Sequence, residues 1–356
     1  MKTEKIYQGN CIDVLKDFPD ESIDCVCTSP PYWGLRDYGT AEWEGGDENC
    51  KHIKKTQKQG GEANRPSKEL TIFQYDKFCK KCGAIRKDKQ LGLEKTPEEF
   101  VANLVKVFSE VKRVLKSSGS VWLNLGDSYA MSSMRGKNSK FKGAVNQSKQ
   151  GIVGIDKKIP IGLKPKDLVG IPFRVAFALQ SDGWYLRQDI IWHKPNPMPE
   201  SVQDRCTKTH EYIFLLTKSP KYFYDIDAIR EPLTESMIKR AKYGWNGVEV
   251  EGRNSPQKCD DMKRFAPEKG RNKRSVWKIT TKPYKEAHFA TFPIELPITC
   301  IKAGCPEGGI VLDPFFGSGT TGLAAQELHR HWVGIELNPE YIEIANRRTS
   351  QSNLFV

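Results

Sequence analysis

The six residues from Thr28 to Trp33, TSPPYW, combine a hydroxyl group, two prolines and two aromatic rings. Consecutive prolines have a fixed φ and no N–H, so the loop presents its carbonyl groups in a stiff arrangement. The Ser29 hydroxyl and the Pro30 carbonyl can each accept one hydrogen of a planar amino group, while Tyr32 stacks on the ring that carries it. Two such acceptors draw the nitrogen, whose lone pair is delocalised, toward tetrahedral geometry. The motif therefore indicates chemistry on an exocyclic amino group without a covalent intermediate.

A second motif, DPFFGSGTTG, runs from Asp313 to Gly322. Its glycines follow the G-x-G-x-x-G spacing of a nucleotide-binding turn, and Glu336, 19 residues after Gly317, is placed to accept hydrogen bonds from a ribose. Taken alone, this spacing also fits a dinucleotide site or a tight turn without a ligand. A triphosphate-binding loop is excluded because no lysine follows the glycines. The carboxylate of Asp313 suits a cationic amino acid group, as in S-adenosylmethionine, better than a pyrophosphate.

Cysteine and histidine in the first third of the chain form a candidate metal site. Cys50-x-His52 and Cys79-x-x-Cys82 supply four ligands of the kind that tetrahedral structural Zn²⁺ prefers. A lone Cys-x-x-Cys is often no metal site, but here it closes a loop that is polar and basic and has no core of its own. The sequence therefore predicts a structural zinc ion that closes this loop and orients its lysines.

The basic charge of the chain is confined to three segments. Segment 51–89 carries 12 basic and 4 acidic residues, segment 131–166 carries 9 and 1, and segment 232–285 carries 14 and 6. Each segment therefore has a net charge of +8. The whole chain carries only +12, so the remainder is net acidic. Solvated lysines can simply keep loops soluble, but three basic loops on an acidic core favour a surface that faces phosphate.

Length and composition predict a soluble α/β protein. The 356 residues suffice for one large domain with insertions or two modest ones, and 38% hydrophobic and 28% charged residues exclude disorder as the main state. No apolar run approaches a membrane span, and the N-terminus lacks an apolar signal core. Ten scattered cysteines are too few for a disulfide framework, so we expect mostly free thiols and a cytoplasmic protein without a membrane partner.

Strand and helix patterns alternate along the chain. We expect strands at 5–8, 23–27, 120–125, 186–192, 211–217, 310–313 and 332–336, and helices at 11–18, 173–180, 320–329 and 339–348. The clearest helix has Thr96 as its N-cap, Pro97 in its first turn, Glu99 in a capping box, and Gly119 at its end. This alternation predicts a three-layer, doubly wound, mainly parallel α/β sheet of the Rossmann-like kind.

In both motifs the sequence resembles the amino-group DNA methyltransferases, which methylate N4 of cytosine or N6 of adenine. Their S/D/N-P-P-Y loop matches Ser29, Pro30, Pro31 and Tyr32, which the resemblance makes the catalytic residues. It also implies S-adenosylmethionine as the cofactor. The residues expected to bind it lie in the glycine turn, on the next strand and in the segment HFATFP: Asp313, Phe315, Gly317, Ser318, Gly319, Thr320, Glu336, Phe292 and Pro293.

The order of the motifs resembles the β arrangement of that family, because the catalytic loop precedes the cofactor loop. The arrangement implies a circularly permuted sheet. Relatives with serine in the catalytic loop mostly methylate cytosine N4 and those with aspartate mostly adenine N6, so Ser29 favours cytosine and leaves adenine as the alternative. The target base is expected to flip out of the duplex and stack on Tyr32.

The resemblance and the charge pattern together divide the chain into functional parts. The catalytic core is expected to comprise residues 1–49, 90–130, 167–231 and 286–356. The zinc-binding insertion is expected at 50–89, a DNA-facing loop at 131–166 and the target recognition region at 232–285. Double-stranded DNA is the expected partner. The residues expected to contact it are Lys137, Lys140, Lys142, Lys194, Asn196, Arg253, Arg264 and Arg271.

The resemblance also implies a bacterial or phage-encoded protein associated with the nucleoid, and a cognate restriction endonuclease. The oligomeric state stays open between monomer and homodimer. Three rival functions explain less of the sequence. A protein-glutamine methyltransferase would have asparagine in place of Ser29, a dehydrogenase leaves the TSPPYW motif unexplained, and a non-catalytic zinc-containing DNA-binding protein leaves the glycine turn unexplained.

Overall fold

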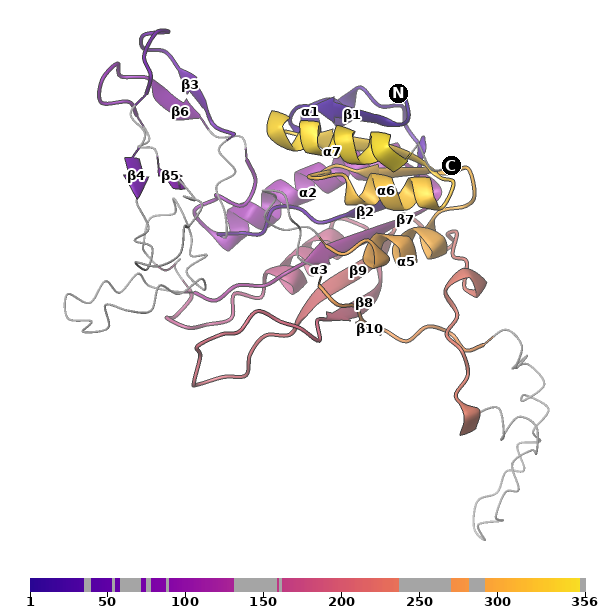
Figure 1. The fold of residues 1–356 in the computed structure, drawn as a ribbon. Helices are drawn as coiled ribbons and strands as arrows, with labels where there is room; N and C mark the ends of the chain where they lie inside the picture. The colour runs from indigo at the N-terminus through magenta and orange to yellow at the C-terminus, as the bar shows by residue number, and fades with distance from the viewer. Residues whose placement is uncertain are drawn as a thin grey trace.

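The computed structural model describes residues 1–34, 40–52, 55–57, 72–74, 78–87, 90–130, 159, 162–236, 270–281 and 292–352. Within these ranges one eight-stranded sheet forms the centre of the molecule (Figure 1). From one edge to the other its strands are β1 (Lys5–Gln8), β12 (His331–Glu336), β11 (Ile310–Asp313), β2 (Ile23–Thr28), β7 (Leu115–Leu125), β9 (His210–Thr217), β8 (Tyr185–His193) and β10 (Val276–Lys278). Only β9 runs antiparallel to its neighbours in the sheet.

Helices cover both faces of this sheet (Figure 1). One hydrophobic cluster joins the first face to α1 (Cys11–Lys16), α2 (Pro97–Val114) and α3 (Ile171–Ser181). A second cluster joins the other face to α5 (Glu295–Gly304), α6 (Thr320–Glu327) and α7 (Pro339–Ser352). The predicted three-layer, mainly parallel α/β sheet is confirmed. None of the described helices is long and apolar enough to span a lipid bilayer.

Most of the predicted elements form where the sequence placed them. The Thr96 hydroxyl accepts a hydrogen bond from the backbone N–H of Glu99, 3.1 Å away, and caps α2 as predicted. The predicted end of that helix at Gly119 is wrong. The helix ends at Val114, because Leu115 already pairs with Ile23 in the sheet. Gly119 instead lies inside β7, where a Cβ atom would be 2.5 Å from the Leu115 side chain.

Several elements carry no clear signal in the sequence. The helix α5 was not predicted, and neither was β10, which lies within the basic segment 232–285 and pairs with β8. A short 3-10 helix spans Asp227–Ile229. Two small antiparallel ribbons, β3 (Glu42–Glu44) with β6 (Ile85–Lys87) and β4 (Lys55–Gln57) with β5 (Ile72–Gln74), lie outside the main sheet. Figure 1 shows both at the side of the molecule where α2 begins.

The parallel pairing brings the two sequence motifs together. The strand before the TSPPYW loop, β2, is hydrogen-bonded directly to β11, the strand before the glycine turn. Both strands end at the same edge of the sheet, because parallel strands share one direction. In open α/β sheets, ligands bind outside the carboxyl ends of the strands. The fold therefore places both motifs where such a site is expected.

Phe316 anchors the glycine turn to the sheet. Its ring stacks on Trp332 with centroids 5.1 Å apart, and it is 3% exposed. Two glycines make room for it, since a Cβ atom on Gly334 would lie 2.4 Å from the Phe316 Cγ and one on Gly322 would lie 2.7 Å from its Cζ. The backbone N–H of Phe316 also donates to the Ile335 carbonyl, 2.9 Å away.

We expect Gly334→Ala to destabilise the protein by about 1–3 kcal/mol, the usual cost of an added methyl group in a filled core. Denaturant unfolding measures this loss. Adding Phe316→Leu to Gly334→Ala should restore part of the stability, because a smaller side chain frees the space that the new methyl group needs. If Gly334→Ala leaves the unfolding midpoint unchanged, the Phe316 ring does not pack as described.

Candidate active site

A cavity of ≈ 450 Å³ lies at the carboxyl edge of the sheet. This volume is in the range of sites that bind small molecules. Residues of both motifs line it together with the turn after β1, Asn124 of β7, Trp192 of β8 and Glu211 of β9. Twelve of the lining residues are ones that the sequence singled out: Ser29, Pro30, Pro31, Tyr32, Lys194, Phe292, Asp313, Phe315, Gly317, Ser318, Thr320 and Glu336.

Asp313 links the two motifs at the bottom of the cavity. Its carboxylate accepts hydrogen bonds from the Thr28 hydroxyl at 2.6 Å, the Thr321 hydroxyl at 2.7 Å and the Phe315 backbone N–H at 3.0 Å. The residue is 2% exposed. Burial raises the pKa of Asp313 from 3.8 to about 6, because the loss of water outweighs these three hydrogen bonds. A carboxylate offers about four acceptor positions, so one remains for a ligand in the cavity.

Glu336 holds the glycine turn from the end of β12. One carboxylate oxygen accepts from the Gly317 N–H and the other from the Asn338 N–H, both at 2.8 Å. Burial raises the pKa of Glu336, and these backbone hydrogen bonds oppose that shift in part. Because each oxygen keeps a second lone pair, Glu336 can accept hydrogen bonds from two neighbouring hydroxyl groups of a ligand.

The TSPPYW loop is fixed by the segment that leads into α2. The Trp33 indole N–H donates to the Glu94 carbonyl at 3.0 Å, and the Gly34 N–H donates to the Gly92 carbonyl at 2.8 Å. Gly92 has a φ of +92°, and a Cβ atom there would lie 2.9 Å from the Tyr32 carbonyl oxygen. Only glycine therefore allows this close approach.

The Tyr32 ring lies against the end of β7, where a Cβ atom on Gly126 would be 2.5 Å from its Cε2. Its hydroxyl lies 2.7 Å from Glu211 Oε2 and 3.1 Å from Asn124 Oδ1. The Ser29 hydroxyl lies 3.4 Å from the Tyr32 hydroxyl. Sequence reasoning missed both Glu211 and Asn124, which line the cavity from neighbouring strands β9 and β7. Asn124 stands between two leucines in β7, whereas Glu211 directly follows His210 at the start of β9, so only Asn124 carried a signal in the sequence.

Comparison with known proteins agrees with this geometry. A family model described as "DNA methylase" matches residues 23–347. The chain belongs to this DNA methylase family. It is 40% identical over 353 residues to the type II methyltransferase M.XycI of Xanthomonas campestris pv. cyanopsidis, covering 99% of this chain and 90% of that one. It is 41% identical over 343 residues to the type II methyltransferase M.Cfr9I of Citrobacter freundii, covering 96% and 86%.

A solved structure shares the fold of this DNA methylase. The PvuII DNA methyltransferase (cytosine-N4-specific) superimposes with a TM-score of 0.56 at 18% identity, covering 98% of this chain and 86% of that one. The family establishes the chain as a DNA methyltransferase that acts on amino groups and uses S-adenosylmethionine. The cavity suits that methyl donor, because it presents the acceptor groups of Asp313 and Glu336 among the apolar faces of Phe292, Phe315 and Ile335.

No cysteine nucleophile serves this DNA methylase among the described lining residues. Cys11 is the one cysteine among them, and burial raises its pKa to about 12, so the thiol stays protonated at neutral pH. The nine described cysteines are free of disulfide bonds, as the sequence predicted.

Other residues chosen from the sequence lie elsewhere in the structure. Gly319 is the N-cap of α6 with φ 81°, and Pro293 accepts a hydrogen bond from Leu296 at the start of α5. The Asn196 amide pairs with the backbone of Thr281 at 2.9 and 3.0 Å. Arg271 forms an ion pair with Glu231 at 3.1 Å. Neither Asn196 nor Arg271 is among the described lining residues of the cavity.

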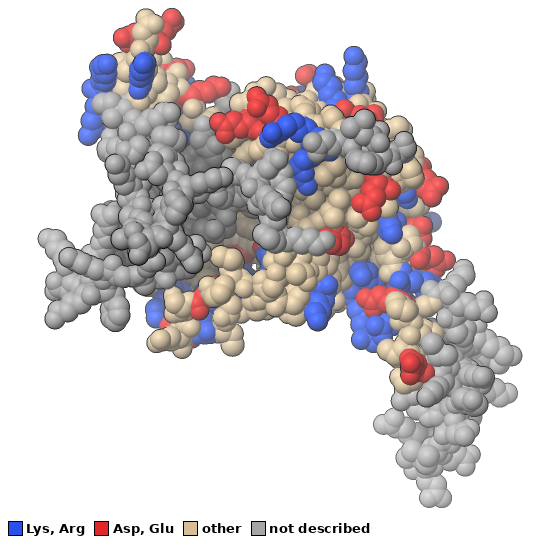
Figure 2. All heavy atoms as spheres, viewed as in Figure 1, with Lys and Arg blue, Asp and Glu red and all other residues tan. Residues whose placement is uncertain are grey.

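The remaining residues expected to contact DNA lie outside the described ranges: Lys137, Lys140, Lys142, Arg253 and Arg264. Most of the three basic segments lies outside them as well. On the described surface that Figure 2 shows, basic and acidic side chains are interspersed. The predicted DNA-facing surface therefore stays a prediction.

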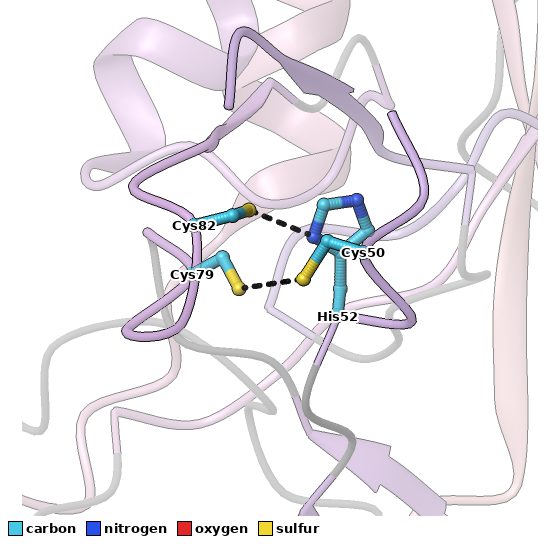
Figure 3. Close-up of side chains that lie close together, drawn as sticks. All are labelled: Cys50, His52, Cys79 and Cys82. Atoms are coloured by element: carbon cyan, nitrogen blue, oxygen red, sulfur yellow. Dashed lines mark hydrogen bonds between the residues drawn. The ribbon is translucent and has the colours of Figure 1, made fainter. Parts of the chain in front are cut away.

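The four candidate metal ligands converge as the sequence predicted (Figure 3). The ligand atoms of Cys50, His52, Cys79 and Cys82 all lie within 4.8 Å of one another. Cys50 Sγ lies 3.8 Å from Cys79 Sγ, and Cys82 Sγ lies 3.7 Å from His52 Nδ1. Two sulfurs on a tetrahedral zinc ion with bonds of about 2.3 Å would be about 3.8 Å apart. The donor set and its spacing therefore fit zinc.

We expect the affinity for S-adenosylmethionine to rise as the pH rises from 5 to 7. With a pKa of about 6, Asp313 is protonated at pH 5 and must ionise to face the ligand's ammonium group. Isothermal titration calorimetry should show a gain of roughly tenfold per pH unit below the pKa. Asp313→Asn should lose this dependence, and it should bind about 10- to 100-fold more weakly at pH 7, as expected for a charge-assisted contact.

Asp24→Asn is the matched control, because Asp24 accepts a hydrogen bond from Ile310 at the opposite end of the same two strands. It should keep the pH dependence of the wild type. Equal wild-type affinities at pH 5 and pH 7 would show that Asp313 does not face the ammonium group.

Proposed function

We propose that this DNA methyltransferase methylates N4 of cytosine in duplex DNA. The observation that carries the proposal is the Ser29 hydroxyl at the cavity wall, at the position where relatives that modify cytosine mostly have serine and those that modify adenine mostly have aspartate. Adenine N6 remains the alternative, since the same loop geometry can hold either amino group.

The residues of the TSPPYW loop are the proposed catalytic residues. The Ser29 hydroxyl and the Pro30 carbonyl accept the two amino hydrogens, Pro31 stiffens the loop, and Tyr32 stacks on the flipped base. Several observations support these roles. All four residues line the cavity, and Gly126 leaves the space that the Tyr32 ring occupies. Lys194, which also lines the cavity, is proposed to contact the DNA backbone or base at its mouth.

The proposed cofactor contacts follow the hydrogen-bonding capacity left in the cavity. Asp313 faces the methionine ammonium and Glu336 the ribose hydroxyls, while the glycine turn and Phe292 close around the ligand. When bound, S-adenosylmethionine supplies the electrophilic methyl group. The chain's own residues orient the amino nitrogen toward it, exclude water and hold the departing proton.

We also propose the predicted division of the chain. On the basis of charge and composition, segment 131–166 is the DNA-facing loop and segment 232–285 is the target recognition region. A circular permutation is supported by the strand order, since β1 at the start of the chain pairs with β12 near its end. The type II relatives suggest a cognate restriction endonuclease as a partner and a cytoplasmic bacterial setting.

A structural zinc ion is proposed for the cluster of Cys50, His52, Cys79 and Cys82. Supporting it, Gly46 and Gly83 shape the site. A Cβ atom on Gly46 would lie 2.8 Å from Cys82 Sγ, and the Gly83 N–H donates to the Cys79 carbonyl at 2.8 Å. The cluster joins two chain segments that reach the active site, because Thr40 before it and Gln90 after it both line the cavity. We therefore propose that the metal fixes one wall of the base pocket.

The target base is tested by digesting DNA from cells that express the chain and separating its nucleosides by mass spectrometry. We expect N4-methylcytosine above the background of a host without this modification. The Ser29→Ala variant, which keeps the loop backbone, should lower the yield by 10²-fold or more, as expected when a group aimed at the transition state is removed. Detection of N6-methyladenine in place of N4-methylcytosine would establish the alternative.

Zinc is tested by elemental analysis of the purified protein. We expect about one zinc ion per chain, because four ligands complete a tetrahedral site. Cys79→Ser should lower this content and weaken binding to cognate DNA, while the affinity for S-adenosylmethionine stays near that of the wild type. Cys206→Ser is the control, since Cys206 is an exposed cysteine outside the cluster. An unchanged zinc content in Cys79→Ser would contradict the proposed site.

A further inference from the structure

Three polar side chains form a continuous hydrogen-bonded row from the catalytic loop into the sheet. The Ser29 hydroxyl donates to the Tyr32 hydroxyl at 3.4 Å, and the Tyr32 hydroxyl donates to Glu211 at 2.7 Å. All three residues line the cavity. The row therefore begins at the group proposed to hold the amino hydrogen and ends at a carboxylate.

The direction of these hydrogen bonds sets the chemistry at Ser29. A hydroxyl has one proton, and in this row the Ser29 proton points to Tyr32 and the Tyr32 proton to Glu211. The lone pairs of the Ser29 oxygen therefore face the cavity as acceptors. Hydrogen bonds in a row strengthen one another, so the carboxylate at the end makes Ser29 a better acceptor.

Glu211 is held in place by its other contacts. Its second oxygen forms an ion pair with Lys194, whose ammonium lies over the Trp192 ring, 4.3 Å from the centroid. The Asn124 amide donates to the same Glu211 oxygen as Tyr32 at 3.2 Å and to the Tyr212 carbonyl at 3.1 Å. The Glu211 and Lys194 side chains are only 16% and 20% exposed. This carboxylate is thus oriented toward Tyr32.

We propose that Glu211 is a positioning residue that takes up the proton released by the amino group, through Tyr32 and Ser29. The inference rests on the proposed amino-group transfer. As the nitrogen forms its bond to the methyl carbon, the carbon–sulfur bond breaks and its electron pair stays on sulfur. The nitrogen is then positively charged and loses one hydrogen as a proton to Ser29. The Ser29 proton moves to Tyr32 and the Tyr32 proton to Glu211, so both hydroxyl groups end neutral.

The test compares Tyr32→Phe, Glu211→Gln and the double variant in single-turnover methyl transfer to duplex DNA. Tyr32→Phe keeps the ring that stacks on the base, and Glu211→Gln keeps the shape of the side chain, so each removes one link of the row. Each variant should slow methyl transfer by about 10²-fold, which is the lower end of the range expected when a proton-transfer step is impaired. The double variant should be about as slow as either single variant, because breaking a row twice costs little more than breaking it once.

Two further readouts separate this role from a merely structural one. Fluorescence of 2-aminopurine at the target position reports base flipping, and calorimetry reports the affinity for S-adenosylmethionine. Both should stay within about twofold of the wild type in Tyr32→Phe and in Glu211→Gln. Glu110→Gln is the matched control, because Glu110 is also a partly buried, ion-paired glutamate but lies outside the described lining of the cavity. It should transfer methyl groups at the wild-type rate.

The proposal is overturned if Glu211→Gln stays within threefold of the wild-type rate, if the two changes multiply in the double variant, or if base flipping falls together with the rate. Failure of the proposed function would look different. In that case the wild-type protein would methylate no amino group in DNA. Transfer to adenine in place of cytosine would leave this role of Glu211 intact, because both amino groups must lose a proton.

Discussion

The hydrogen bond from Thr28 to Asp313 joins two segments that are 285 residues apart in the chain. It connects the end of β2, which carries the TSPPYW loop, to the end of β11, which carries the glycine turn. Both side chains are nearly inaccessible to water, so an unpaired carboxylate there would be costly. The contact therefore fixes the separation of the TSPPYW loop and the glycine turn, and the rest of the cavity is arranged around it.

The apolar core supports that contact from both faces of the sheet. The two hydrophobic clusters hold β2 and β11 at the centre, with three helices on each side. Phe316 packs against Gly334 and Trp332, and this packing holds the glycine turn next to Asp313 and Glu336. Burial raises the pKa of both carboxyl groups, a perturbation that is typical of functional sites.

The TSPPYW loop is also held by a part of the chain outside the parallel strands. Gly92 and Glu94, which follow the cysteine and histidine cluster, accept hydrogen bonds from Gly34 and Trp33. The loop thus has two supports, the sheet edge at Thr28 and the segment before α2 at Gly92 and Glu94.

The sequence by itself determined the alternation of strands and helices, both motifs and the four candidate metal ligands, because each depends on local spacing and residue type. Only the tertiary structure decided which polar residues meet. Glu211 and Asn124 belong to no motif in the sequence, and their place beside Tyr32 depends on the antiparallel pairing of β9 with β7. The end of α2 was misplaced for the same reason, because pairing of Leu115 with Ile23 across the sheet outweighed the local signal of Gly119.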